Sequence, residues 1–280
     1  MPPGTMPGQM PQRQPIPGVK YLVAVASGKG GVGKTTVAVN LALALAKLGH
    51  QVGLLDADVY GPNVPIMLGS KDEPMATPQQ RIIPVQAQGL KMISMRLLNP
   101  GDKPVIWRGP MLHSVITQFL RSVEWGELDY LVIDLPPGTG DVQLTLIQTV
   151  EVTGAVVVTT PSTVALADVR KAIEMFRQVN VEVLGVVENM STFNCPHCGK
   201  GIDIFGHGEG AKTATEYGVP VLGEIEIDPR IRLGGDTGHP VAAQGESAPA
   251  AQSLYRVAKA IAARLGEVAA TSGGPTVQID

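Results

Sequence analysis

The sequence predicts an α/β fold with a doubly wound, mainly parallel sheet and helices on both faces. Short hydrophobic runs rich in β-branched residues alternate with helical segments along the chain. The runs are continuous and do not alternate with polar residues, which is typical of parallel strands covered on both faces. Hydrophobic residues make up 44% of the 280 residues, enough for a sizeable core. Strands that alternate with helices assemble into such a sheet because each helix returns the chain across one face.

The elements follow in order along the chain. The expected strands are residues 21–26, 52–56, 130–134, 155–159 and 184–188, with weaker candidates at 91–95 and 222–225. The expected helices are residues 34–48, 111–123, 142–150, 165–178, 210–217 and 250–265. The Pro-rich segment 71–84 is interpreted as a loop insertion. One ATPase-sized domain over residues 19–268 is therefore expected, between a disordered Pro/Met/Gly-rich tail at 1–18 and a flexible tail at 269–280.

Composition argues against several classes of function. The net charge is −3 and aromatic residues make up only 4%, so neither a basic surface nor aromatic stacking favours nucleic-acid binding. No apolar run reaches the roughly 18 residues of a membrane helix, and the first residues do not resemble a signal peptide. Two cysteines exclude a disulfide framework. We therefore expect a cytoplasmic protein that binds neither nucleic acid nor membrane.

A phosphate-binding motif lies between the first expected strand and the first expected helix. The segment matches G-x-x-x-x-G-K-[ST] and reads Gly28, Lys29, Gly30, Gly31, Val32, Gly33, Lys34, Thr35, with Thr36 next. Glycines let backbone N–H groups point at phosphate oxygens, and the helix N-terminus adds its dipole. Lys34 is expected to neutralise phosphate charge and Thr35 to ligate Mg²⁺. The alternative is a plain glycine-rich turn, which the strand and helix on either side disfavour.

Acidic residues end two further strands. Asp134 ends the strand 130–134, as a Mg²⁺-directed carboxylate should, and is followed by a Pro-Pro-Gly loop suited to sensing a γ-phosphate. Asp56 and Asp58 lie at the end of the strand at 52–56. Because the carboxyl ends of parallel strands meet at the ligand crevice, these carboxylates are expected near the phosphates. Each could instead be a turn or cap residue.

Lys29 lies inside the phosphate motif and gives it a second lysine. The segment from Lys29 to Thr35 resembles the deviant Walker A motif of MinD/ParA-type ATPases. That resemblance implies that Lys29 reaches the nucleotide of a partner subunit and that Asp58 orients the attacking water. The implied catalytic set is thus Lys29, Lys34, Asp58 and Asp134.

The two cysteines form a single C-x-x-C pair, Cys195 and Cys198. A thioredoxin-like redox pair would leave the phosphate motif unexplained. A zinc site within one chain would need two more ligands, for which His197 and His207 are nearby but His197 is poorly placed. A structural turn with two reduced thiols is the simplest reading. Two copies of the chain would supply four thiolates, enough for a [4Fe–4S] cluster or Zn²⁺ at a dimer axis.

Several motifs together resemble the Mrp/ApbC-type iron–sulfur cluster carrier ATPases. They are the residues 105–111 (VIWRGPM), 134–141 (DLPPGTGD), 187–190 (VENM) and 195–199 (CPHCG), in this order. The resemblance spans about residues 19–265. It implies a homodimer that hydrolyses ATP, carries a labile iron–sulfur cluster at the C-x-x-C pair and delivers it to apo-proteins. Arg108 belongs to the first motif, but no role follows for it.

The same resemblance gives two candidates for the adenine pocket. Asn189, by its place after a strand, matches the adenine-contacting position, and Pro229 is a weaker candidate; a strand-end cap and a turn are the alternatives. Two other functions remain open at this point. One is a positioning ATPase switch of the MinD/ParA kind, and the other is an ATPase dimer stapled by zinc.

Overall fold

The protein is described here by a computed structural model covering residues 13–58, 61–95 and 120–272. The strands are β1 (Val19–Ala26), β2 (Val52–Asp56), β3 (Met75–Ala76), β4 (Ile82–Ile83), β5 (Val85–Ala87), β6 (Leu90–Ser94), β7 (Leu128–Asp134), β8 (Gly154–Thr159), β9 (Val183–Asn194), β10 (Gly201–Ile202) and β11 (Val221–Ile227). The α-helices are α1 (Lys34–Lys47), α2 (Val64–Met67), α4 (Asp141–Thr149), α5 (Thr163–Gln178), α6 (Glu209–Glu216), α7 (Pro229–Asp236) and α8 (Gln252–Ser272). Short 3₁₀ turns are η2 (Val241–Gln244) and η3 (Pro249–Ala251).

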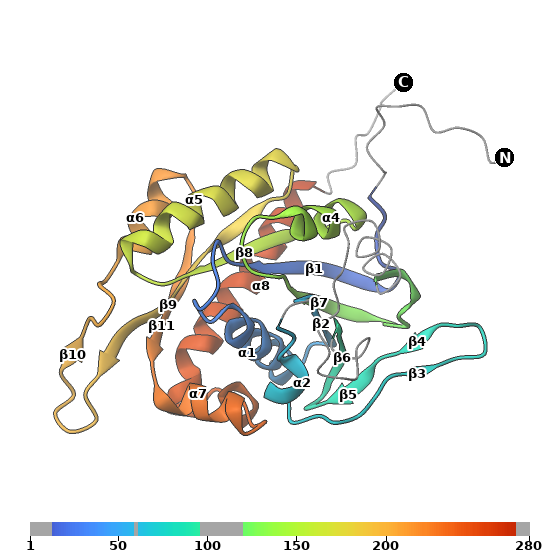
Figure 1. Cartoon of the computed structure of the whole chain (residues 1–280), viewed down its shortest axis with the longest axis horizontal. Coiled ribbons are helices and arrows are strands. Elements are labelled where there is room, and N and C mark those ends of the chain that lie inside the picture. Colours follow the sequence, from blue (N-terminus) through green and yellow to red (C-terminus); the bar gives the residue numbers. More distant parts are fainter. Residues whose placement is uncertain (1–12, 59–60, 96–119, 273–280) are drawn as a thin grey trace.

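The central sheet is mainly parallel, as expected. Its strand order is β10-β9-β8-β1-β7-β2-β6-β5, and β11 pairs with β9 in parallel. Only β5 and β10 run antiparallel to their neighbours among the described strands of this sheet. β1 lies between β7 and β8, so the chain reverses its winding direction beside β1 (Figure 1). A ligand crevice in such a sheet lies at this switch point, at the carboxyl ends of the strands.

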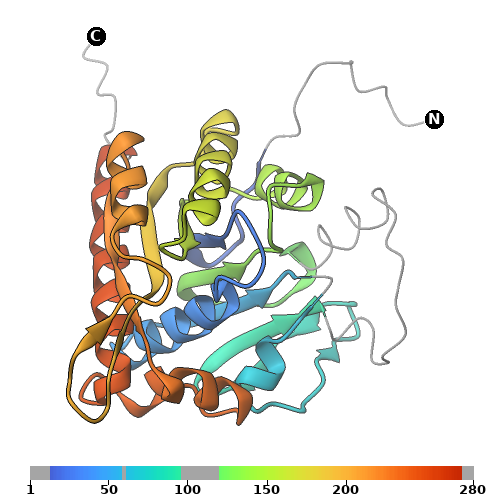
Figure 2. The same cartoon turned by 60° about the vertical axis from the view of Figure 1, so that its left-hand side comes forward.

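Helices cover both faces of the sheet (Figures 1 and 2). β1 shows why: Val23 and Val25 belong to the core shared with α1 and α8, whereas Leu22, Ala24 and Ala26 belong to the core shared with α4 and α5. Both cores are sealed from solvent, so a strand at the centre needs apolar side chains at every position. This confirms the predicted fold class and explains the continuous hydrophobic runs.

Two elements continue well past their predicted ends, one because of strand pairing and the other because of side-chain packing. The strand expected to end at residue 188 continues to Asn194, since β10 and β11 pair with its polar second half. The last helix continues to Ser272, past the expected start of a flexible tail at 269. There Val268 packs against the core, and Glu267 pairs with Arg264 at 2.8 Å.

The N-terminal tail also differs from the prediction where it is described. Ile16 is buried in the core beneath α4 and α5, and Gln14 forms a bridge with Val150. Residues 13–18 are therefore part of the packed domain, because an apolar side chain gains more by burial than by solvent exposure. The predicted helix at 111–123 lies largely outside the described residues, as do Arg108, residues 1–12 and residues 273–280.

Helix α7 is not among the expected helices; the sequence predicts Pro229 only as a weaker candidate for the adenine pocket, with a turn as the alternative. Asp228 is its N-cap and accepts a hydrogen bond from the N–H of Arg230 at 2.8 Å, and Pro229 occupies the first turn. This is a common helix start. Gly234 and Gly235 inside the helix hide the signal. Among the described helices, none has the length and apolar character to cross a bilayer.

Candidate functional site: a phosphate loop and a cysteine hairpin

The phosphate loop (residues 28–35) connects β1 to α1 at the switch point of the sheet. Gly31 and Gly33 adopt φ angles of +83° and +82°, which favour glycine. Gly33 is the N-cap of α1, and no side chain caps that end of the helix. The first turn of α1 also carries no acidic residue. The N-terminal N–H groups and the helix dipole are therefore available to an anion.

The glycines of the loop serve two purposes. A Cβ on Gly28 would lie 2.3 Å from the carbonyl oxygen of Asp168, and one on Gly33 would lie 2.3 Å from Nδ2 of Asn189. These two glycines allow α5 and β9 to approach the loop closely. A Cβ on Gly30 or Gly31 would meet nothing within 4 Å. That half of the loop is open, as a cradle for a ligand must be.

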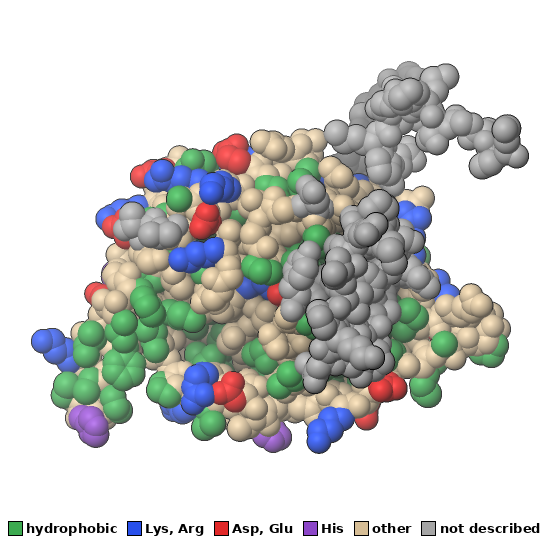
Figure 3. All heavy atoms as spheres, viewed as in Figure 1, with side chains coloured by type: hydrophobic (Ala, Val, Ile, Leu, Met, Phe, Trp, Pro, Cys, Tyr) green, Lys and Arg blue, Asp and Glu red, His purple; other side chains and the backbone are tan. Residues whose placement is uncertain are grey.

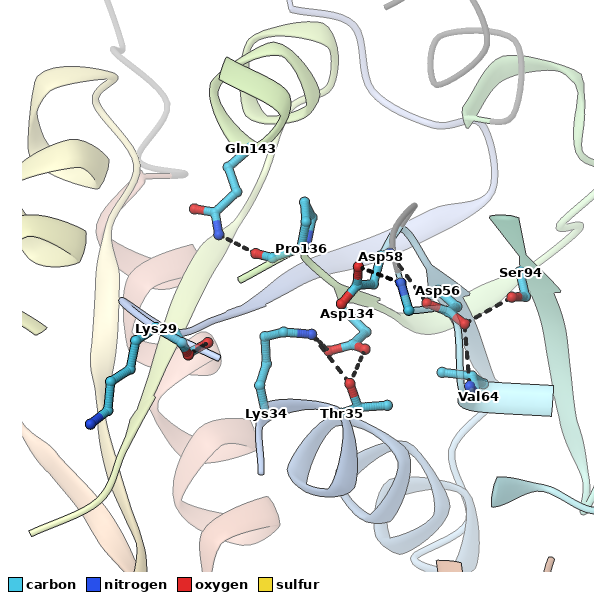
Figure 4. A network of polar contacts seen from close by, with 12 residues as sticks. Lys29, Lys34, Thr35, Asp56, Asp58, Val64, Ser94, Asp134, Pro136 and Gln143 are labelled. Atoms are coloured by element: carbon cyan, nitrogen blue, oxygen red, sulfur yellow. Dashed lines mark hydrogen bonds and ion pairs between the residues drawn. The ribbon is translucent and has the colours of Figure 1, made fainter. Parts of the chain in front are cut away.

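A buried ion pair lies directly behind the loop. Nζ of Lys34 is 2.5 Å from Oδ1 of Asp134, and the Thr35 hydroxyl donates to Oδ2 of Asp134 at 2.7 Å (Figure 4). Lys34 is 6% exposed and Asp134 is fully buried. Burial raises the pKa of Asp134, and the Lys34 ammonium and the Thr35 hydroxyl partly oppose that rise. Thr35 and Asp134 present adjacent oxygen donors, the type that Mg²⁺ prefers.

Asp56 is a second buried carboxylate beside the first. It ends β2 directly opposite Asp134 in the register of β2 and β7. Its oxygens accept hydrogen bonds from the Ser94 hydroxyl at 2.8 Å and from the N–H of Val64 at 3.2 Å. Burial and the neighbouring Asp134 charge raise the pKa of Asp56 to about 7. Two carboxylates this deep in one site favour a cation or a proton between strands.

Asp58 and Lys29 flank this pair on different sides. Asp58 is 9% exposed, its N–H donates to Oδ1 of Asp56 at 3.2 Å, and its Oδ1 accepts from the N–H of Gly61 at 3.2 Å. The side chain of Lys29 points away from Lys34 and Asp134 (Figure 4). The structure thus brings Lys34, Asp58 and Asp134 together and leaves Lys29 outside that group.

Two residues near the site were missed by the sequence analysis. Gln143 of α4 is buried and donates through Nε2 to the carbonyl oxygen of Pro136, holding the Pro-Pro-Gly loop (Figure 4). Gly138 of that loop donates to the carbonyl oxygen of Ser27 at 3.0 Å, so the loop is tied to the phosphate loop. The other missed residue is Ser94, whose bond to Asp56 joins β6 to the site. An isolated Ser or Gln carries no sequence signal for such a role.

A hollow of about 700 Å³ opens beside the phosphate loop. Its lining includes Gly33, Thr35, Thr36, Asn189, Met190 and Pro229. Asn189 lies inside β9 and not after a strand, which corrects the prediction. It is 6% exposed, and its Nδ2 donates to the carbonyl oxygen of Val32 at 2.8 Å. Asn189 therefore holds the phosphate loop through Val32 and also lines the hollow.

Cys195 and Cys198 lie at the tip of a hairpin made by the end of β9 and β10, here called the cysteine hairpin (residues 193–202). Asn194 pairs with Gly201, and Phe193 pairs with Ile202. The loop between them is closed by the N–H of Cys195 donating to Lys200 at 3.0 Å and that of Gly199 donating to Cys195 at 2.9 Å. Cys198 is exposed and Cys195 is partly exposed. The hairpin projects from one end of the sheet (Figures 1 and 2).

The chemistry of Cys195 suits a metal ligand. Hydrogen bonds from the N–H groups of His197 and Cys198, and from the Cys198 thiol, lower the pKa of Cys195. A thiolate is the form that binds metals. Within the described residues, no His, Asp or Glu joins the two thiols in a cluster of three possible ligands. The monomer accordingly offers two ligands at this place, which is half of a four-ligand site.

Apolar side chains gather around the cysteine hairpin (Figure 3). Ile202, Ile204 and Phe205 are 48%, 54% and 48% exposed. Solvent exposure of three large hydrophobic side chains in four residues is unfavourable for an isolated chain, and such patches mark contact surfaces. The thiols are thus next to a surface suited to a protein partner.

Comparisons with known proteins agree with this geometry. The ParA family profile described as "NUBPL iron-transfer P-loop NTPase" matches residues 18–262. The "Iron-sulfur cluster carrier protein" of Aquifex aeolicus is 55% identical over 251 residues, which cover 89% of this chain and 69% of that protein.

Solved structures share the fold. A nucleotide-binding protein in complex with ADP from Archaeoglobus fulgidus aligns with a TM-score of 0.71 and 42% identity, over 79% of this chain and 87% of that one. The cell division ATPase MinD of Pyrococcus furiosus aligns with a TM-score of 0.62 and 25% identity, over 87% of this chain and 98% of that one. The family resemblance drawn from the sequence motifs is therefore confirmed. The chain belongs to the ParA family of P-loop NTPases, in the group described as NUBPL iron-transfer P-loop NTPases.

Proposed function

We propose that this protein is an ATP-hydrolysing carrier that binds a labile iron–sulfur cluster between two copies of the chain and transfers it to apo-proteins. One observation carries the proposal: two thiols lie on an exposed hairpin tip without a third ligand among the described residues, on a chain with a phosphate loop. A complete site within one chain would trap its cargo. A half-site on each of two chains can assemble and come apart, as transfer requires. The name of the Aquifex aeolicus relative supports the same reading.

The nucleotide is proposed to bind along the phosphate loop with its base in the adjoining hollow. N–H groups of residues 28–36 and the α1 dipole face the phosphates, and Asn189 and Pro229 lie at the wall assigned to adenine. When the nucleotide is bound, the ammonium of Lys34 moves from Asp134 to the phosphate oxygens, because the phosphates carry more negative charge than the carboxylate. Thr35 and Asp134 are the residues to hold Mg²⁺, which supplies charge neutralisation at the phosphates when bound.

Hydrolysis then needs an oriented water. Asp58, at the rim of the buried carboxylate pair, is proposed to align a water for attack on the γ-phosphorus. The water oxygen bonds to phosphorus while the bond from phosphorus to the β–γ bridging oxygen breaks. The bond's electron pair stays on the leaving ADP, and one proton of the water passes to the released phosphate. Lys29 points away from the site of its own chain, which supports its action on the nucleotide of the partner subunit (Figure 4). A second cation stabilises the charge that develops during transfer.

The cargo is proposed to be a [4Fe–4S] cluster held by Cys195 and Cys198 of each of two chains. Four thiolates complete its coordination. The exposed Ile202, Ile204 and Phe205 beside the thiols supply apolar surface for the second copy or for a recipient apo-protein. Exposure of the thiols supports transfer, because a recipient's ligands must reach the cluster.

Anaerobic reconstitution with iron and sulfide tests the proposal. We expect about four iron and four sulfide per two chains, a dimer in sedimentation, and transfer to an apo-ferredoxin-type acceptor. The Cys195→Ser/Cys198→Ser chain is expected to hydrolyse ATP normally but to take up no cluster. Full cluster uptake by that variant would refute the site.

Metal analysis of anaerobically purified protein separates the cluster from zinc. Stoichiometric zinc at the thiols, with no iron uptake on reconstitution, would favour a zinc-stapled ATPase dimer. Binding of ATP-loaded protein to lipid vesicles or DNA, unaffected by loss of the cysteines, would instead favour a positioning switch. The cluster carrier requires neither result.

A further inference from the structure

We propose that Glu188, His207 and Glu224 form a second metal site, which takes a divalent first-row transition ion such as Zn²⁺ or Fe²⁺. One ligand atom of each residue lies within 4.8 Å of the ligand atoms of the other two. None of the three belongs to the phosphate loop or to the cysteine pair. The inference is independent of the proposed cluster carriage, because the two cysteines play no part in it.

The two carboxylates come from adjacent strands. Glu188 of β9 and Glu224 of β11 are direct partners in the parallel register. Side chains at paired positions lie on the same face of a sheet, so two like charges are placed side by side. Such a pair is destabilising by itself. A cation between the two carboxylates converts the repulsion into attraction, which gives a physical reason for the pairing.

Glu188 is held in a fixed orientation. It is 1% exposed, and its two oxygens accept hydrogen bonds from the N–H groups of Gly208 at 3.1 Å and Gly210 at 2.7 Å. A carboxylate oxygen has two lone pairs, so each oxygen can still bind a metal. A Cβ on Gly210 would lie 2.6 Å from Oε2 of Glu188, so a side chain at this position would displace the carboxylate. These bonds also fix the segment that follows His207.

His207 adds a nitrogen ligand from the segment between β10 and α6. Its Nδ1 is 3.5 Å from the Thr192 hydroxyl, which in turn donates to Oδ1 of Asp203 at 2.8 Å. A hydroxyl beside the ring restrains its orientation, as outer-shell partners of metal-binding histidines do. His207 is exposed, so an ion can enter from solvent.

The donor set selects the class of ion. One imidazole and two carboxylates suit Zn²⁺, Fe²⁺ or Mn²⁺. Ca²⁺ and Mg²⁺ prefer oxygen ligands alone, and Cu⁺ prefers thiolates. A bound ion would join β9, β11 and the segment before α6. β9 leads into the cysteine hairpin, and β11 pairs with β9 as far as Phe193, so the ion would brace the base of the hairpin that carries the thiols.

Zn²⁺ titration followed by imidazole ¹⁵N NMR tests the site directly. The experiment uses the full chain with Cys195→Ser and Cys198→Ser, which removes the competing thiols. The chain has five histidines, and His207→Gln assigns the His207 signals. We expect the His207 ring signals to shift and saturate at one equivalent of Zn²⁺. Glu224→Gln should weaken binding at least about ten-fold, since even the loss of outer-shell partners costs that much.

Glu226→Gln is the matched control. Glu226 lies on the same strand as Glu224, is partly exposed and pairs with Arg256 at 3.3 Å. Its substitution therefore removes one negative charge, as Glu224→Gln does, but outside the proposed metal site. Its Zn²⁺ affinity should stay within two-fold of the parent. The proposal is wrong if the His207 signals of the parent do not move by one equivalent. It is also wrong if a folded Glu224→Gln chain binds Zn²⁺ as tightly as the parent.

Discussion

The phosphate loop and the cysteine hairpin are built on opposite principles. At the phosphate loop, Lys34, Asp56 and Asp134 are buried, and each has partners within the chain. At the hairpin, Cys198 is exposed, and backbone hydrogen bonds close the loop. The comparison teaches that the proposed nucleotide site is pre-organised inside one chain, whereas the proposed cluster site lies at the surface and is incomplete among the described residues of one chain.

One strand joins these two regions. In β9, Asn189 holds the phosphate loop through Val32, and Cys195 follows only six positions later, directly after the strand. The wall formed by Ile227, Asp228 and Pro229 also borders both the hollow at the phosphate loop and a second one, of about 630 Å³, at Cys195. The predictions below test how far the two regions nevertheless behave independently.

The largest expected effect is on ATP hydrolysis. Lys34 is the only lysine that contacts Asp134 in the described structure, and it is also the cation expected at the phosphates. Lys34→Ala removes both interactions. Turnover should fall by about 10³-fold or more, the range for loss of a transition-state cation. Lys47→Ala, at the exposed C-terminal end of the same helix, should leave turnover unchanged. Steady-state phosphate release measures both, and iron uptake by Lys34→Ala should remain normal if the regions are separate.

The next effect concerns the dependence of stability on pH. The pKa of Asp56 is about 7 in the folded chain, above the value near 4 of an unfolded carboxyl. The folded state therefore holds the extra proton between about pH 4 and pH 7, and stability falls as the pH rises through this interval. Asp56→Asn should remove that slope, which amounts to a change on the order of 4 kcal/mol.

Urea unfolding at several pH values, without nucleotide or Mg²⁺, measures this slope. Asp72→Asn, on an exposed loop, is the control and should keep the slope of the parent. An unchanged slope in Asp56→Asn would show that another group holds the proton.

Two glycines compare the regions by the same substitution. Gly33 and Gly199 have similar φ angles of +82° and +70°. Alanine at Gly199 meets nothing within 4 Å and should cost about 1 kcal/mol of unfolding free energy through backbone strain alone. Alanine at Gly33 also meets Asn189, so it should cost at least about 1 kcal/mol more. Equal losses in thermal or urea unfolding would contradict the tight packing assigned to the phosphate loop.

The smallest expected effect is at Cys195. Because neighbouring N–H groups lower its pKa, the thiolate of Cys195 should persist to a lower pH than that of an ordinary cysteine. Alkylation of the Cys198→Ala chain by iodoacetamide, followed by mass spectrometry across pH 6–10, should show half-maximal rate below about pH 8.5. Cys195→Ala reports the other thiol in the same assay. A rate profile centred at or above the ordinary value would contradict the hydrogen-bonded loop.

The sequence by itself determined the fold class, the phosphate loop and the pairing of the two cysteines. Continuous hydrophobic runs, a G-x-x-x-x-G-K-[ST] pattern and C-x-x-C spacing are local signals, because each depends on residues close together in the chain. The family resemblance also followed from short motifs in a fixed order. Local signals also predicted most of the strands and helices that the structure describes.

Only the tertiary structure decided which distant residues meet. The pairing of Asp56 with Asp134, the hydrogen bond from Asn189 to Val32 of the phosphate loop and the pairing of Glu188 with Glu224 depend on strand order and register. So does the continuation of β9 to Asn194, whose polar residues become a strand because β10 and β11 supply hydrogen bonds. Contacts between residues far apart in sequence are fixed by packing of the whole sheet, and no short stretch of sequence encodes them.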